Sequence, residues 1–337
     1  MSKRPSPISA TVDFEADGIQ HGFLKLPISD DESAWGAVMI PVTVINNGDG
    51  PTALLTGGNH GDEYEGITAL LKLSSSLKAE DVTGRVIIVP MMNVPAAMAG
   101  KRTSPMDGGN LNRSFPGDPD GTVTEKIADY FTRVMVPMCD VVLDLHSGGR
   151  TLDIIPFGAS HVLDNPEQQR QALAGAMAFG APYAMMMFEL DAAALFDTAV
   201  ESQGKIFVAT ELGGGGTSTP QSLAITERGV RNFLIHYGLV AGEVEKPTEP
   251  QVYLDMPDAS CYVQSEHSGL LELTFALGDR VEKGEVIARV YDMTRSGTPP
   301  VEYHAGRSGL LAARRFPSRV NMGDTIAVIA DVVDSLG

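Results

Sequence analysis

Two residues of metal-binding type stand three positions apart near the start of the chain, in the segment GGNHGDE at positions 57–63. On one helical turn, His60 and Glu63 would point the same way, because residues three apart share a helix face. A neutral imidazole and a carboxylate held together in this way can bind zinc. Short motifs recur by chance, so the pair gains weight only from residues elsewhere in the chain.

A third candidate ligand, His146, follows the strand-like run VVLDL at 141–145 and precedes a glycine turn. With His60 and Glu63 it makes a set of two histidines and one carboxylate. Such a set leaves a fourth zinc position open for water, as in catalytic zinc sites, whereas structural sites close with four protein ligands, usually cysteines. Asp144 lies two residues earlier on the same strand face. It either orients a ligand or is an ordinary acid at a strand end.

A third apolar run, 205–210, ends at Glu211, and four glycines follow at 213–216. Open α/β sheets place their chemistry outside such strand ends, so Glu211 is the candidate general base. Taken singly, His60, His146 or Glu211 would more often be a satisfied polar residue than a catalyst. Their shared position, at the end of an apolar run and beside glycine, favours a functional site.

A polar loop rich in glycine and proline, 102–117, lies between the first two of these segments. Arg102 and Arg113 could clamp a carboxylate there, because arginine binds carboxylates through two parallel hydrogen bonds. Asn112 would supply both a donor and an acceptor beside them. The alternative is that both arginines are exposed and solvated, as arginines in loops usually are.

The elements that must position these residues alternate between strand and helix from about residue 45 onward, which is typical of a three-layer α/β domain. Residues 1–45 contain apolar runs that we expect to form strands feeding the same sheet. The expected strands are 53–57, 86–90, 140–145 and 205–210, and the expected helices are 63–78, 122–136, 166–179 and 221–238.

A change of composition at 242–250 marks a boundary, so we expect a hydrolase-type domain at 1–245 and a β-rich domain at 250–337. The second domain contains an internal repeat. The segment SGLL at 268–271 returns at 308–311, and 284–288 returns as 323–327. Two such halves resemble a barrel-sandwich fold of the biotinyl or lipoyl type. The chain lacks the hairpin lysine motif of carrier domains there, which favours a packing or lid role.

The order His60, Glu63, Asn112-Arg113, His146 and Glu211 resembles that of the succinylglutamate desuccinylase and aspartoacylase family, a branch of the zinc carboxypeptidase-like hydrolases. The resemblance covers about residues 50–240 and implies a mixed sheet. It implies one zinc ion per chain on His60, Glu63 and His146, with Glu211 as base and acid. It further implies that Asn112 and Arg113 bind the substrate carboxylate and that Arg102 polarises the scissile carbonyl.

Within this family, segments 57–66 and 110–117 are most similar to the branch that deacetylates N-alpha-acetyl-L-2,4-diaminobutyrate in ectoine breakdown. Where aspartoacylases carry an arginine for the second substrate carboxylate, this chain has Glu201, and Asp197 replaces an aromatic residue. Such a charge inversion would select an amine-bearing side chain. Alternatively, both acids lie on a solvated helix face, and Glu189 or Asp191 takes that role.

The composition sets limits on partners and location. The formal net charge of -18 opposes binding to nucleic acids or anionic membranes. Neither a signal peptide nor a long apolar span is present, so we expect a cytoplasmic protein, with a homo-oligomer left open. Cys139 and Cys261 give no disulfide framework or zinc-thiolate spacing. The remaining histidines lack a partner at ligand spacing or suit a helix end: His21, His161, His236, His267 and His304.

The sequence thus predicts a zinc-dependent amidohydrolase that removes an acyl group, with acetyl favoured, from an N-acyl amino acid. Water activated by zinc and by the Glu211 base would attack the amide. Three alternatives stay open. The substrate could be a dicarboxylate, as in desuccinylases and aspartoacylases; it could be a peptide, as in zinc carboxypeptidases; or the chain could bind metal without turnover.

Overall fold

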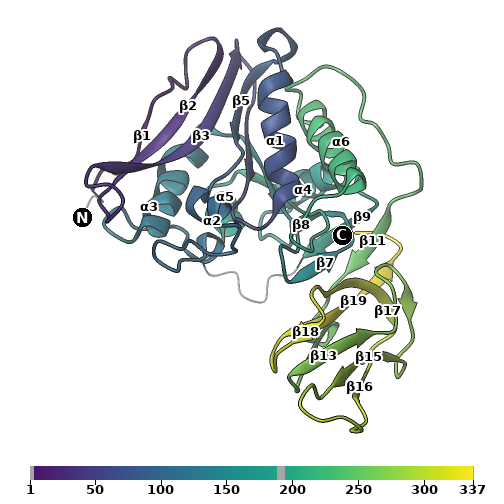
Figure 1. The fold of residues 1–337 in the computed structure, drawn as a ribbon. Helices are drawn as coiled ribbons and strands as arrows, with labels where there is room; N and C mark the ends of the chain where they lie inside the picture. Colours follow the sequence, from purple (N-terminus) through teal and green to yellow (C-terminus); the bar gives the residue numbers. More distant parts are fainter. Residues whose placement is uncertain (1–3, 188–193, 337) are drawn as a thin grey trace.

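The computed structural model describes residues 4–187 and 194–336, which form a larger α/β part and a smaller β-rich part (Figure 1). The helices of these residues are α1 Tyr64–Ser76, α2 Val94–Ala99, α3 Val123–Tyr130, α4 Pro166–Phe179, α5 Phe196–Glu201 and α6 Pro220–His236. The strands of the α/β part are β1 Ser9–Ala10, β2 Gly18–Ile28, β3 Gly36–Asn47, β4 Thr52–Gly57, β5 Gly84–Val89, β6 Val141–His146, β7 Leu152–Ile154, β8 Phe157–His161, β9 Tyr183–Met187 and β10 Ile206–Glu211.

The strands of the β-rich part are β11 Val252–Asp255, β12 Tyr262–Gln264, β13 Gly269–Leu273, β14 Arg280–Val281, β15 Val286–Tyr291, β16 Val301–His304, β17 Gly309–Arg315, β18 Arg319–Val320 and β19 Thr325–Val333. In the α/β part the strand order is β1-β2-β3-β5-β4-β6-β10-β8-β9. Strands β5, β4, β6 and β10 are mutually parallel, whereas β2, β3 and β8 add antiparallel pairings. The predicted mixed sheet is therefore confirmed.

Helices cover both faces of this sheet, because successive strand residues point to opposite sides. On one face, Leu54 of β4 packs in a buried cluster with Phe131 and with Phe196 of α5. On the other face, Leu55 joins a cluster that includes Leu70 of α1 and other residues of α4 and α6. The central strands are apolar on both sides and lie buried between two helical layers.

Local signals explain why the longest predicted helices form where they do. Helix α4 starts at Pro166 after Asn165, whose side chain accepts from the first free backbone N–H groups, and it stops at Gly180 in the left-handed conformation. Helix α6 starts with a capping box between Thr219 and Ser222. These caps satisfy backbone groups that a helix end leaves without partners.

The predicted strands and helices agree with the observed ones to within a few residues, but several short elements were missed. Predicted helix 122–136 is α3 followed by a π-helical turn at Phe131–Met135 and a 3-10 turn at Val136–Met138. Helices α2 and α5 and strands β7, β8 and β9 were not predicted. They span only three to six residues, which is too short to show a periodic pattern.

In the β-rich part, the two copies of the sequence repeat occupy equivalent places. Strands β13 and β17 each begin at the repeated Ser-Gly-Leu-Leu segment, and each pairs antiparallel with the strand that contains the second repeated segment, β15 or β19. Gly284 and Gly323 precede those partners with φ of +92° and +90°, a conformation that favours glycine. Pairings of β7 with β17 and of β9 with β11 join this part to the α/β sheet.

Candidate active site

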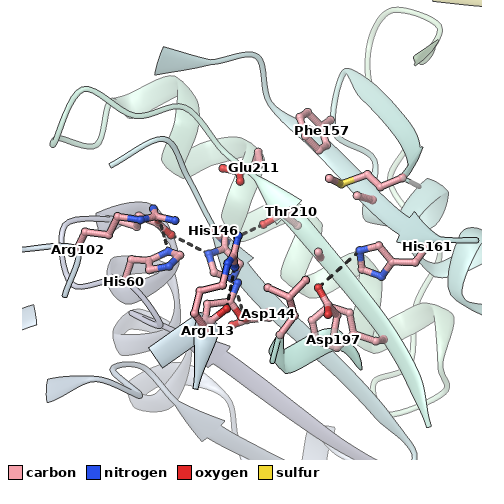
Figure 2. Close-up of a pocket in the computed structure, with 17 residues that line it drawn as sticks. His60, Arg102, Arg113, Asp144, His146, Phe157, His161, Asp197, Thr210 and Glu211 are labelled. Carbon is pink, nitrogen blue, oxygen red and sulfur yellow. Dashed lines mark hydrogen bonds and ion pairs between the residues drawn. The ribbon is translucent and has the colours of Figure 1, made fainter. Parts of the chain in front are cut away.

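The candidate ligands and base meet because three parallel strands end at the same edge of the sheet. In the register of β6 and β10, Glu211 is the partner of His146, and in that of β4 and β6, Gly57 is the partner of Leu145. The turn that follows β4 brings His60 to this edge. Figure 2 shows His60, His146 and Glu211 around one cavity. This is the edge at which open α/β sheets place their sites.

The turn between β4 and α1 needs glycine, which explains the composition of the first motif. A Cβ atom at position 61 would lie 2.0 Å from the backbone carbonyl carbon of Ala96 in α2. The turn and α2 can therefore pack this closely only because residue 61 is glycine. Glu63 then takes the N-cap position of α1 in an extended conformation. This tight approach fixes the direction of His60 and Glu63 toward the strand ends.

Three side chains form a possible metal site. The Nδ1 atom of His60 lies 2.7 Å from one carboxylate oxygen of Glu63, and the Nδ1 atom of His146 lies 2.9 Å from the other. The three donor atoms lie within 4.8 Å of one another. Because the set contains two imidazoles and one carboxylate, it has the composition of a zinc site that keeps a position open.

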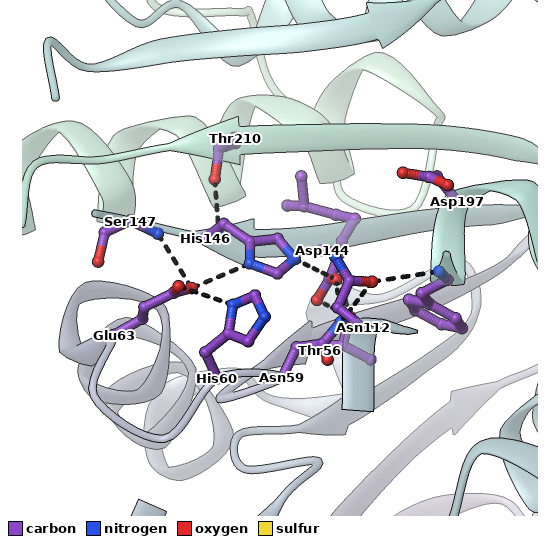
Figure 3. Close-up of polar contacts among 12 residues, drawn as sticks. Thr56, Asn59, His60, Glu63, Asn112, Asp144, His146, Ser147, Asp197 and Thr210 are labelled. Carbon is purple, nitrogen blue, oxygen red and sulfur yellow. Dashed lines mark hydrogen bonds and ion pairs between the residues drawn. The ribbon is translucent and has the colours of Figure 1, made fainter. Parts of the chain in front are cut away.

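Further polar side chains hold the outer edges of the two imidazoles, and Figure 3 shows those around His146. Asp144 lies 2.8 Å from Nε2 of His146, and its carboxylate also accepts from Thr56 Oγ1 at 2.7 Å and Asn59 Nδ2 at 3.1 Å. Asn110 lies 3.2 Å from Nε2 of His60. Such partners turn the Nδ1 atom of each ring toward the metal position and fix its tautomer.

Charge and burial act together on these groups. The two histidines outweigh the burial of Glu63 and hold its pKa far below the usual range. Although burial works against it, the carboxylates of Asp144 and Glu63 raise the pKa of His146. Burial lowers the pKa of His60 despite the neighbouring Glu63. The carboxylates of Glu63 and Asp144 therefore favour positive charge at this place, which suits a bound cation.

Glu211 lies across the cavity from His60 and differs from Glu63 in its surroundings. Burial, reinforced by the negative charge of Glu63, raises the pKa of Glu211 to about 8. Its Oε2 atom is buried and has no hydrogen-bond partner among the residues that the structure describes. A carboxyl group in this state can take up and return a proton near neutral pH.

The cavity has a volume of about 190 Å³ and brings together every predicted site residue except Glu201. Its lining consists of His60, Glu63, Arg102, Asn112, Arg113, Asp144, His146, Phe157, Ala159, His161, Met187, Leu195, Asp197, Phe207, Ala209, Thr210 and Glu211. Figure 2 shows His60 and Arg102 on one side of this cavity and His161 with Asp197 on the other.

The loop 102–117 contributes two arginines and an asparagine. The Nη1 atom of Arg102 lies 3.3 Å from Glu63, and its side chain is 48% exposed, so it borders both the cluster and solvent. Arg113 donates to the backbone carbonyl of Asn112 at 2.8 Å. The side-chain oxygen of Asn112 accepts from the backbone N–H of Phe196 at 3.1 Å, which ties this loop to the start of α5.

The two acids of α5 do not lie on a solvated face. The side chains of Asp197 and Glu201 are 11% and 8% exposed, and both lie close to His161, at the end of β8. Solvation was the wrong alternative because α5 packs against the sheet through Phe196 and Val200, which turns these acids inward. Glu189 and Asp191 lie outside the described residues.

Sequence reasoning assigned His161 no partner, and the structure gives it one 40 residues away in Glu201. The sequence signal for a role of His161 was weak: like His146, His161 ends a short run of small and apolar residues. Elsewhere, Cys139 and Cys261 are buried, and neither forms a disulfide bond. Within the described ranges, the helices include none long and apolar enough to cross a membrane.

Comparisons with known proteins agree with this geometry. The family model described as "Succinylglutamate desuccinylase/Aspartoacylase catalytic domain" matches residues 49–237 of this chain. The N-alpha-acetyl-L-2,4-diaminobutyric acid deacetylase of Halomonas elongata is 84% identical over 335 residues, which is 99% of this chain and 98% of that protein.

Solved structures cover almost the whole chain. The product-bound ectoine utilization protein EutE (DoeB) from Ruegeria pomeroyi superposes with a TM-score of 0.95 at 56% identity, covering 97% of this chain and 100% of that one. A succinylglutamate desuccinylase from a Silicibacter species gives a TM-score of 0.96 at 56% identity, covering 98% and 100%. The chain belongs to the succinylglutamate desuccinylase/aspartoacylase family of deacylases.

Proposed function

We propose that this protein is a zinc-dependent deacylase that removes the acetyl group from N-alpha-acetyl-L-2,4-diaminobutyrate. The observation that carries the proposal is the placement of His60, Glu63 and His146 beside Glu211 in one cavity. The 84% identical deacetylase from Halomonas elongata supports the choice of substrate.

His60, Glu63 and His146 would hold the zinc ion, because their donor set of two nitrogens and a carboxylate suits it. When bound, zinc would supply a Lewis acid that polarises the amide carbonyl and makes water more acidic. Asp144 and Asn110 keep both ring Nδ1 atoms turned toward it.

Glu211 would act as the base and the acid of the reaction. It takes a proton from the attacking water, and it later gives that proton to the nitrogen of the leaving amino group. The buried Oε2 atom faces few competing groups, and the raised pKa of Glu211 keeps proton uptake and return close in free energy. The products are acetate and the free amino acid.

Arginines would handle the negative charge in this site. Arg102, 3.3 Å from Glu63, would donate to the carbonyl oxygen as negative charge develops on it. Arg113 and Asn112 would bind the α-carboxylate of the substrate and hold the amide in line with Glu211. Asp197 and Glu201 would favour a cationic side chain at the other end of the cavity.

We also propose the finer organisation expected from the sequence: a hydrolase domain at 1–245 and a barrel-sandwich-like domain at 250–337 that packs beside it. The paired repeat segments support this division, because each half joins two strands in the same antiparallel way. A cytoplasmic location and a homo-oligomer stay predictions.

A direct test measures amine release by the zinc-loaded protein from N-alpha-acetyl-2,4-diaminobutyrate, N-acetylaspartate and N-succinylglutamate side by side. We expect the first to react with the highest kcat/KM. Preference for a dicarboxylate would keep the deacylase and reject the substrate, a result that the 56% identical desuccinylase makes worth testing. Release from none of them would reject the proposed function.

A further inference from the structure

Asn59, in the turn between β4 and α1, is a fully buried residue that contacts side chains from two other segments (Figure 3). Its Nδ2 atom lies 3.1 Å from the Asp144 carboxylate and 3.3 Å from Oδ1 of Asn112. Asn112 belongs to the lining of the cavity, whereas Asn59 does not. Any effect of Asn59 on a ligand must therefore pass through one of these two neighbours.

The orientation of the Asn59 amide follows from the groups around it. A carboxylate accepts hydrogen bonds, so the NH2 group of Asn59 must face Asp144. This group has two N–H bonds and can donate one to Asp144 and the other to Asn112. The Oδ1 atom of Asn59 is buried and has no hydrogen-bond partner among the residues that the structure describes. Asn59 thus leaves one acceptor unpaired, at a cost in free energy, while its donors serve two neighbours.

The backbone that carries Asn59 is held in place by the segment after β5. The carbonyl groups of Gly57 and Gly58 accept from the backbone N–H groups of Met92 and Asn93, at 2.9 Å and 3.0 Å. Gly58 has a φ of +61°, a conformation that favours glycine. Asn59 is therefore a fixed point against which a side chain of the loop 102–117 can be oriented.

Two donors meet at the side-chain oxygen of Asn112. Besides the NH2 group of Asn59, the backbone N–H of Phe196 lies 3.1 Å from this oxygen. A backbone N–H can only donate, so this end of the Asn112 amide is the acceptor. The NH2 group of Asn112 lies at the opposite end of the amide, away from both donors. Because Asn112 lines the cavity, its N–H groups can donate to a ligand there.

We propose that Asn59 is a positioning residue that keeps the NH2 group of Asn112 turned toward the cavity for the α-carboxylate of the substrate. The inference rests on the proposed function, since it names what orients the residue that binds this carboxylate. A donor fixed in advance loses little entropy when the ligand arrives. Asn59 itself touches neither the substrate nor the reacting atoms.

Two donors hold the amide of Asn112 more firmly than one. In the reversed orientation the NH2 group of Asn112 would face the N–H groups of Asn59 and Phe196, and both hydrogen bonds would be lost. The amide oxygen would then face the cavity, where it repels a carboxylate. Without Asn59, only the donor of Phe196 opposes this reversal.

The test compares two ligands that differ only in the α-carboxylate. The zinc-loaded Glu211→Gln protein is titrated calorimetrically with N-alpha-acetyl-2,4-diaminobutyrate and with N-acetyl-1,3-diaminopropane, in which hydrogen replaces the carboxylate. The ratio of the second dissociation constant to the first measures the carboxylate preference. We expect Asn112→Ala to lower this preference about 10- to 100-fold, as for loss of a hydrogen bond to a charged group. Asn59→Leu, which keeps the size of the side chain and removes its donors, should lower it about fivefold.

A double substitution and a matched control locate this effect. In a protein that already carries Asn112→Ala, Asn59→Leu should not lower the carboxylate preference further, because no amide remains to be oriented. Thr56→Val removes another donor of Asp144, at 2.7 Å, and leaves both donors of Asn112 in place, so the preference should stay. Zinc content and circular dichroism check that each protein is loaded and folded.

Three results would overturn the inference. They are an unchanged preference in Asn59→Leu, an equal loss when Asn112→Ala is already present, and an equal loss in Thr56→Val, which would mean that Asn59 acts through Asp144. No preference for the carboxylate ligand before substitution, or an Asn112→Ala protein that keeps it, would overturn the inference as well. Should Asn59→Leu not fold, Asn59→Ala must lower the preference. A protein that shows the expected pattern but releases no amine would reject the proposed function alone.

Discussion

Each end of the cavity contains a histidine that is held by a buried carboxylate, but the two pairs are built differently. At the end with the possible metal site, called the metal end below, Asp144 lies 2.8 Å from Nε2 of His146 and turns the Nδ1 atom of that ring toward Glu63. At the far end, Glu201 lies 2.9 Å from Nδ1 of His161 and turns Nε2 toward Asp197. In both places a buried acid selects which imidazole nitrogen faces the cavity.

The difference lies in how the chain builds each pair. Asp144 and His146 stand two residues apart on one strand, so strand geometry alone places them on the same face. Glu201 and His161 come from α5 and β8, and only packing brings them together. The metal end can therefore be found from local sequence, whereas the far end depends on the tertiary fold.

The largest expected effect is on catalysis, and it comes from substitution of the proposed general base. Glu211→Gln should lower kcat for N-alpha-acetyl-2,4-diaminobutyrate about a thousandfold, the usual contribution of a general base, while the protein still binds zinc. Steady-state kinetics and metal analysis of the purified protein measure both. The matched control is Glu80→Gln, which removes an exposed acid and should leave kcat nearly intact. A Glu211→Gln protein with full turnover would remove Glu211 from the mechanism.

Glu65 is a buried acid that, unlike Asp144 and Glu201, has no histidine partner among the described contacts. Burial raises its pKa to about 7, and its Oε2 atom has no hydrogen-bond partner among the described residues. The folded state therefore holds a proton that the unfolded state releases above about pH 4.5, so stability falls as pH rises toward 7 and the loss is complete above it. Glu65→Gln should remove about 3 kcal/mol of this loss.

Urea unfolding of the metal-free protein at pH 5 and pH 8 tests this statement about Glu65. The free energy of unfolding should fall less between the two pH values in Glu65→Gln than in the unsubstituted protein. Glu80→Gln, which removes an exposed acid, is the control for loss of one charge. Equal pH slopes in all three proteins would contradict the assignment of a raised pKa to Glu65.

Asp144→Asn tests whether the two acid–histidine pairs act independently. Zinc affinity should fall about 10- to 100-fold, since an asparagine no longer supports the basicity of His146. The ratio of the dissociation constants for N-alpha-acetyl-2,4-diaminobutyrate and for its uncharged analogue N-alpha-acetylnorvaline, which measures ammonium preference, should not change. Competition with a chelator gives the zinc affinity, and calorimetry gives the ratio. A loss of ammonium preference in this variant would show that the two ends are coupled.

The smallest effect concerns the ring behind His161. Phe207→Leu should lower the ammonium preference about two- to fivefold, because the aromatic contact that holds His161 beside Glu201 is lost while most apolar volume remains. The same calorimetric ratio measures it, and zinc affinity serves as the control. An unchanged ratio would mean that Glu201 alone fixes the orientation of His161.

The sequence by itself determined the mixed α/β fold and named the candidate residues of the metal end. His60, His146 and Glu211 each follow an apolar strand and precede glycine, and strands that are parallel and adjacent must end together. The family resemblance was confirmed, because the catalytic-domain description matches residues 49–237. These features depend on hydrophobic runs and turns, which are written in short stretches of sequence.

Only the tertiary structure decided where Asp197, Glu201 and His161 lie. Helix α5 spans six residues and β8 spans five, so neither carries a readable period, and their side chains meet through packing of Phe196 and Phe207. Whether an acid faces solvent or a cavity is settled by contacts between segments far apart in the chain. The sequence names such residues, but their partners depend on packing.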